Sequence, residues 1–103
     1  MSKNDNLLNF KSRNDFQRAF DEKRDDIIEL FEKSQLKVGF IDTADEEGNA
    51  TVVFNSKKPD MQEEAKIISL VNDICEEISI MTGFEVDCTY QKGSRWSAIF
   101  FNK

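Results

Sequence analysis

The sequence contains no histidine, the side chain that most often serves as a general base, a triad member or a zinc ligand. Its four glycines, at positions 39, 48, 83 and 93, are isolated, so no glycine-rich loop is present to bind a phosphate. The acidic residues before Gly48 lack the alternation and the distal glutamate of a calcium loop. We therefore expect a protein that is not an enzyme and that holds neither a metal nor a cofactor.

Long apolar runs are also missing. No segment approaches the roughly 20 apolar residues that a membrane span needs, and the first residues, MSKNDNLLNFKSRND, lack the apolar stretch of a secretory signal. The two cysteines, Cys75 and Cys88, fall at apolar positions of a helical and a strand pattern, which is typical of buried, reduced thiols. We therefore expect a cytoplasmic protein that does not enter a membrane.

The composition is that of a globular domain. Of the 103 residues, 39% are hydrophobic and nine are phenylalanine, which is enough to bury one core of modest size. Residues 1–11 are polar and irregular apart from Leu7, Leu8 and Phe10. The sequence therefore predicts an N-terminal arm over residues 1–11 and a single domain over residues 12–103.

The longest helical pattern runs from Asp60 to Gly83. Its apolar residues recur at alternating steps of three and four and form one broad stripe, made of Ile67, Ile68, Leu70, Val71, Ile74, Cys75, Ile78 and Met81. Asp60 with Glu63 is typical of a capping box, and Gly83 of a left-handed helix terminator. We predict that this segment is the central helix of the domain.

A weaker helical pattern precedes it. Phe16, Phe20, Ile27 and Phe31 share one face, with Leu30 beside them, and Ser12 with Asp15 or Asn14 with Gln17 can cap the start. Lys23 falls on the apolar stripe and weakens the middle of this helix, because its ammonium group must reach water.

Four segments alternate with the period of two that is typical of half-buried strands. Each pair is joined by a short turn, and the first turn requires a positive φ at Gly48 or Asn49. The expected strands are 36–42, 50–55, 84–90 and 96–102. The order helix, hairpin, helix, hairpin predicts an α+β fold of two layers, α-β-β-α-β-β, with a four-stranded antiparallel sheet and both helices on one face.

Strict alternation assigns each strand residue to one face of the sheet. The residues expected to face the helices are Val38, Phe40, Val52, Phe54, Val86, Cys88, Trp96 and Phe100. The residues expected to face outward include Ile41, Val53, Ile99 and Phe101, which is an apolar set for a face in contact with water. Three candidates remain for what covers this face: the N-terminal arm, a second copy in a homodimer, or a target protein.

The charge is unevenly distributed. The chain carries 14 basic and 20 acidic residues, a net charge of −6, which repels nucleic acid and anionic lipid at long range and favours basic partners. Six carboxylates are the candidates for such a contact: Asp45, Glu46 and Glu47 in the first turn, and Asp73, Glu76 and Glu77 on the long helix.

These observations favour a non-enzymatic, acidic protein-binding module. Such a module acts as an inhibitor or adaptor that occupies a basic site on a partner protein, including a site that otherwise holds nucleic acid. The alternative is a small nucleic-acid-binding or regulatory domain that uses the second hairpin, where basic and aromatic residues gather at a turn. The residues of that alternative site are Tyr90, Lys92, Arg95 and Trp96.

Overall fold

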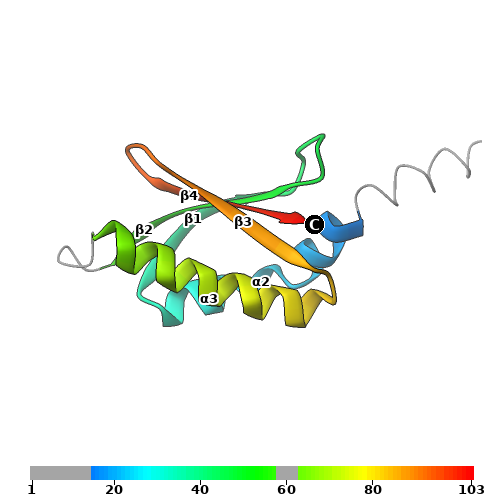
Figure 1. Cartoon of the computed structure of the whole chain (residues 1–103), viewed down its shortest axis with the longest axis horizontal. Coiled ribbons are helices and arrows are strands. Elements are labelled where there is room, and N and C mark those ends of the chain that lie inside the picture. Colours follow the sequence, from blue (N-terminus) through cyan, green and yellow to red (C-terminus); the bar gives the residue numbers. More distant parts are fainter. Residues whose placement is uncertain (1–14, 58–62) are drawn as a thin grey trace, which may run out of the picture.

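The computed structural model describes residues 15–57 and 63–103. Its helices α2 (Arg24–Lys33) and α3 (Glu64–Thr82) alternate with the hairpins β1 (Leu36–Asp42) with β2 (Ala50–Ser56), and β3 (Val86–Lys92) with β4 (Trp96–Asn102). The strands form one antiparallel sheet in the order β1-β2-β4-β3. Figure 1 shows α2 and α3 on the same side of this sheet, which confirms the predicted α+β architecture. The predicted arm over residues 1–11 lies outside the described residues.

The first helical segment is interrupted where the sequence pattern is weakest. Residues 15–22 are helical, Lys23 forms a turn, and α2 follows it. The Lys23 N–H is shared between the carbonyl groups of Ala19 and Phe20, at 3.2 and 3.1 Å. The turn leaves the Lys23 side chain exposed instead of on the buried stripe. The cap residues proposed at positions 12 and 14 lie outside the described part.

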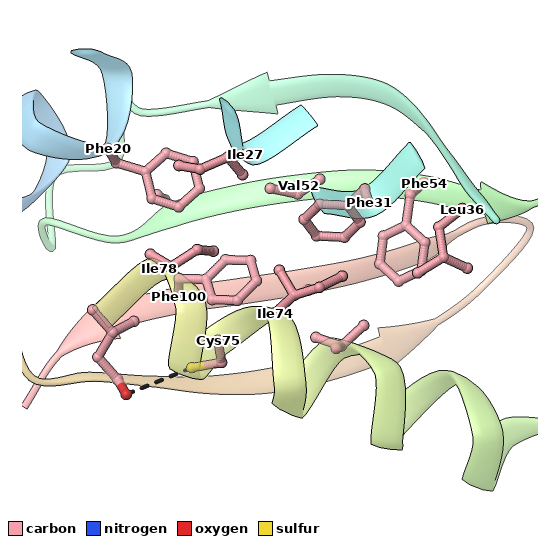
Figure 2. Packing of buried hydrophobic residues seen from close by; sticks show 14 of the residues in the cluster. Phe20, Ile27, Phe31, Leu36, Val52, Phe54, Ile74, Cys75, Ile78 and Phe100 are labelled. Atoms are coloured by element: carbon pink, nitrogen blue, oxygen red, sulfur yellow. Dashed lines mark hydrogen bonds between the residues drawn. The ribbon is translucent and has the colours of Figure 1, made fainter. Parts of the chain in front are cut away.

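Most of the two apolar stripes is buried as predicted, while Ile68, Leu70 and Met81 of the α3 stripe are only partly buried. The core contains Phe16, Phe20, Ile27 and Phe31 from the first segments and Ile67, Val71, Ile74, Cys75 and Ile78 from α3. They pack on the inner residues of the sheet, and Figure 2 shows Phe31, Phe54 and Phe100 close together between the layers. The ring centroids of Phe31 and Phe54 are 5.2 Å apart. This packing fixes which sheet face is covered.

The ends of α3 confirm one sequence prediction and correct another. Gly83 adopts the left-handed conformation, with φ of 77°, and its N–H donates to the Ser79 carbonyl at 2.9 Å. Glu63 is the residue before the helix and makes no side-chain capping bond, so its predicted capping-box role is wrong. That role needs a position inside the first turn, and Asp60, its proposed partner, lies outside the described residues. No helix in the described part is long and apolar enough to cross a membrane.

A bulge in β1 changes the face on which two apolar residues lie. Val38 pairs with Phe54, but Phe40 pairs with Val53, so Gly39 is an extra residue in β1. The prediction that Phe40 faces the helices and Ile41 faces outward is therefore wrong. Ile41 packs against the core, whereas the Phe40 side chain faces outward and is 54% exposed. For the other strands, the register and burial agree with the predicted faces.

Candidate interaction surfaces

The first candidate is the outer sheet face, the side of the sheet opposite α2 and α3. Its apolar residues are Phe40, Val53, Ile99 and Phe101, from β1, β2 and β4. Val53 is 9% exposed, Ile99 and Phe101 are half-buried, and Phe40 is the most exposed of the four. Three of these were predicted from the sequence, and Phe40 takes the place of Ile41. In the described part of the chain, no helix covers this face (Figure 1).

A basic turn borders one end of this face. The β3–β4 turn and the neighbouring strands form a shallow hollow of about 600 Å³, lined by Phe40, Val53, Ser97 and residues 91–95. Arg95 reaches from this turn across β2 to the bulge, where its Nη1 atom lies 2.8 Å from the position that a Cβ at residue 39 would occupy. The arginine therefore lies beside the exposed Phe40 ring.

Opposite charges lie on either side of Phe40 along β1. Lys37, Phe40 and Asp42 pair with the successive outward residues of β2, Asn55, Val53 and Thr51. All three β1 side chains are exposed. Within residues 15–57 and 63–103, neither Lys37 nor Asp42 belongs to an ion pair. The outer face thus has a cation on one side of an exposed aromatic ring and an anion on the other, each one outward position away in the register.

The second candidate is the α3 acidic face, formed by Asp73, Glu76, Glu77 and Ile80. These residues are spaced as i, i+3, i+4 and i+7, so they share one side of the helix. All four are exposed, and Ile80, at 76%, is the most exposed large apolar side chain of the described part. The ion pairs of the described part involve none of the three carboxylates. This face is therefore an uncompensated acidic surface with an apolar side chain at one end.

The other predicted carboxylates lie elsewhere. Asp45, Glu46 and Glu47 belong to the β1–β2 turn, which lies at the end of the hairpin, at the upper right of Figure 1 and away from α3. The Asp45 carboxylate accepts the Glu47 N–H at 2.7 Å, and Gln17 donates to the Asp45 and Asn49 carbonyl groups at 2.8 Å. Buried Gln17 thus anchors this turn to the first helical segment. The two acidic groups do not form one surface.

The residues of the nucleic-acid alternative are also divided between faces. Trp96 is 3% exposed and stacks on Phe54 inside the core, while Tyr90 faces α3 and donates to the Asn72 side chain. Lys92 lies over the inner Trp96 ring, with Nζ 5.3 Å from the centroid. Of the four, only Arg95 reaches the β1 bulge, although Lys92 also borders the hollow at the end of the outer face. A base cannot stack on Trp96 in this arrangement, because the ring is already covered on the helical side.

The two cysteines meet between α3 and β3. The Cys75 thiol donates to the Val86 carbonyl at 3.5 Å (Figure 2), and the Cys88 thiol lies 3.3 Å from the Tyr90 hydroxyl. When Cys88 is ionised, Cys75 and Tyr90 can turn their protons from Val86 and Asn72 to the thiolate, and this lowers the pKa of Cys88 to about 7 against the opposing effect of burial. The pKa of Cys75 is raised by its hydrogen bond to Cys88 and by burial.

These thiols do not extend into a metal site. Among the described residues, no group of three or more Cys, Asp or Glu side chains is arranged to hold a metal ion.

Comparisons of this chain with protein-family models, with curated proteins and with solved structures found no match.

Two features of these surfaces were not predicted from the sequence. The outward Phe40 depends on the Gly39 bulge, and an isolated glycine inside a strand pattern is the available signal for a bulge. Buried Gln17 resembles a helix-capping residue in the sequence, and its partners are carbonyl groups 28 and 32 residues away. No local pattern reveals such a contact.

Proposed function

We propose that this chain is a non-enzymatic protein-binding module that presents the α3 acidic face to a basic site on a partner protein. Bound there, it acts as an inhibitor or adaptor, and it excludes other anionic ligands of that site, nucleic acid included. The observation that carries the proposal is the set of Asp73, Glu76 and Glu77, exposed and free of ion pairs in the described part of the chain.

The physical basis is electrostatic complementarity. Carboxylates already paired within the molecule would gain little from a new cation, whereas unpaired ones retain their field and can steer a basic partner to the helix. Ile80 lies in line with them and supplies an apolar contact that a purely electrostatic surface lacks. A cytoplasmic location, where the two thiols stay reduced, forms part of this proposal.

The test is affinity capture from an extract of the native host, followed by a binding measurement with the captured protein. The variant Glu76→Lys/Glu77→Lys reverses the α3 charges, and Glu46→Lys/Glu47→Lys makes the same change in the β1–β2 turn. We expect a basic partner to bind the wild type and the turn variant. The α3 variant should bind at least about tenfold more weakly, with a flatter salt dependence. If both variants bind the partner with the same affinity, α3 is not part of the interface.

No observation favours the nucleic-acid alternative over this proposal. Its two aromatic residues, Tyr90 and Trp96, point toward the helices, and the net charge of −6 opposes phosphate binding.

A further inference from the structure

The outer sheet face carries a charge pattern that is complementary to itself. Along β1 the exposed side chains follow the order cation, aromatic ring, anion, at Lys37, Phe40 and Asp42. Their partners on β2 are evenly spaced, so the two charges lie one outward step from Phe40 in opposite directions. Arg95 lies over Gly39, in the same hollow as Lys37, and adds to the cationic end. A face with a cationic end, an apolar centre and an anionic end can pair with a copy of itself in the reversed orientation.

We propose that the outer sheet face binds a second copy of this chain, with a two-fold axis that lies in the face and crosses the strands at Phe40. The axis brings Phe40 against the partner's Phe40. It places Lys37 opposite the partner's Asp42 and Asp42 opposite the partner's Lys37. Each copy contributes the same residues, which is the definition of an isologous interface.

Burial of apolar surface supplies the driving force. Phe40, Val53 and Ile99 lie on three adjacent strands, and Phe40 gains most because it is the most exposed of them. Four strands of this length cover a face on the order of 20 by 23 Å, which is small for a stable dimer. We therefore expect association in the micromolar range, with the charges setting the orientation.

The same bulge that exposes Phe40 disfavours pairing through the edge of the sheet. β1 is an edge strand, but Gly39 interrupts its ladder and Arg95 lies over the interruption. A regular, flat edge is what strand addition requires. On the β1 side of the sheet, the face is therefore a better surface for a second copy than the edge.

This inference is independent of the proposed function. α3 lies on the other side of the sheet, so the dimer leaves both α3 acidic faces on its outside (Figure 1). A dimer built this way presents two acidic helices, and its partner binding gains from the second contact.

The first test is sedimentation of the full chain over a concentration series. Wild type should pass from monomer to dimer, and Phe40→Glu should remain monomeric, because it places two carboxylates on the axis. Ile80→Glu is the matched control, since it makes the same substitution at the other highly exposed apolar residue, and it should dimerise like wild type. A wild type that stays monomeric, or a Phe40→Glu variant that dimerises normally, overturns the proposal.

The second test separates this two-fold arrangement from any other. Lys37→Asp and Asp42→Lys should each weaken the dimer by about tenfold, because each places like charges opposite one another twice. Mixing the two variants should restore association as a heterodimer, in which both pairs are again attractive. A mixture no stronger than the separate variants rules out this axis.

One residue in that test also has a structural role. The Asp42 carboxylate accepts the Ala44 N–H at 2.9 Å, so Asp42→Lys can disturb the turn. Asp42→Asn keeps an oxygen acceptor and removes the charge, and it should still weaken the dimer. Circular dichroism of each variant verifies that it is folded. A folded Asp42→Asn variant with wild-type association contradicts the charge pairing.

Discussion

The guanidinium group of Arg95 lies over Gly39, with Nη1 2.8 Å from where a Cβ of residue 39 would be. Arg95 precedes β4 and Gly39 is in β1, and β2 lies between these strands. The Val53 carbonyl oxygen is 3.4 Å from the same position. The space above the bulge is therefore filled by an arginine from the other hairpin. Arg95 therefore connects the two hairpins across the outer face, and its guanidinium group lies close to Phe40.

Deletion of Gly39 should leave the fold intact. Without the extra residue, Val38 and Phe40 can still pair with Phe54 and Val53, and β1 becomes a regular strand. We expect the free energy of unfolding to change by no more than about 1 kcal/mol, since no core residue changes its environment. Denaturant unfolding followed by circular dichroism measures this difference.

Deletion of Lys37 provides the matched control. It shortens the strand by the same amount, but it shifts Leu36, which is fully buried, toward the outer face. The loss of that burial should cost about 2–3 kcal/mol. If the Gly39 deletion is as destabilising as the Lys37 deletion, the assignment of Phe40 to the outer face is wrong.

The bulge also shows where sequence reasoning stops. The faces of β2 and β4 follow from alternation, because buried Val52, Ala98 and Phe100 alternate with more polar or outward neighbours. In β1 the two residues after Gly39 are both large and apolar, so hydrophobicity does not indicate which one faces the core. A single glycine decides between them, and the partner that fills its space, Arg95, is 56 positions away.

The candidate surfaces were predictable to a similar extent. The period of α3 places Asp73, Glu76 and Glu77 opposite the buried stripe, and the structure agrees. Their separation from Asp45, Glu46 and Glu47 depends on how the hairpin crosses the helices, which no local pattern specifies. The residues of the nucleic-acid alternative do not form one surface, because Arg95 lies on the outer face whereas Tyr90 and Trp96 face the helices.

Two isoleucines of α3 provide a test of which helix face is buried. Ile74 is 3% exposed in the core, and Ile80 is 76% exposed on the α3 acidic face. Ile74→Asp places a carboxylate among apolar side chains and should cost about 4 kcal/mol or more, which is much of the stability of a small domain. Ile80→Asp should melt within a few degrees of wild type. Thermal unfolding by circular dichroism measures both, and similar losses would contradict the helix orientation.

The thiol pair predicts that one cysteine of the folded chain reacts selectively. Cys88 is half-buried with a pKa lowered to about 7, whereas Cys75 is buried and its pKa is raised. Only the thiolate attacks an alkylating reagent. The alkylation rate at Cys88 should therefore rise about tenfold per pH unit below pH 7 and level off above it. Mass spectrometry of the folded, reduced chain follows each site, and Cys75 should stay unmodified until the chain unfolds.

The hydrogen bonds to the Cys88 thiolate predict the direction in which each substitution shifts the pKa of Cys88. The bond from Cys75 is the larger cause of the lowered pKa of Cys88, and the Tyr90 hydroxyl adds to it. Cys75→Ala and Tyr90→Phe each remove a donor, so each should move the midpoint of the rate profile to higher pH, the first by more. Cys75→Ser retains a hydroxyl donor and should move it less than Cys75→Ala. Because burial alone raises the pKa of a thiol, a midpoint unchanged in both Cys75→Ala and Tyr90→Phe would show that neither group contacts the Cys88 sulfur.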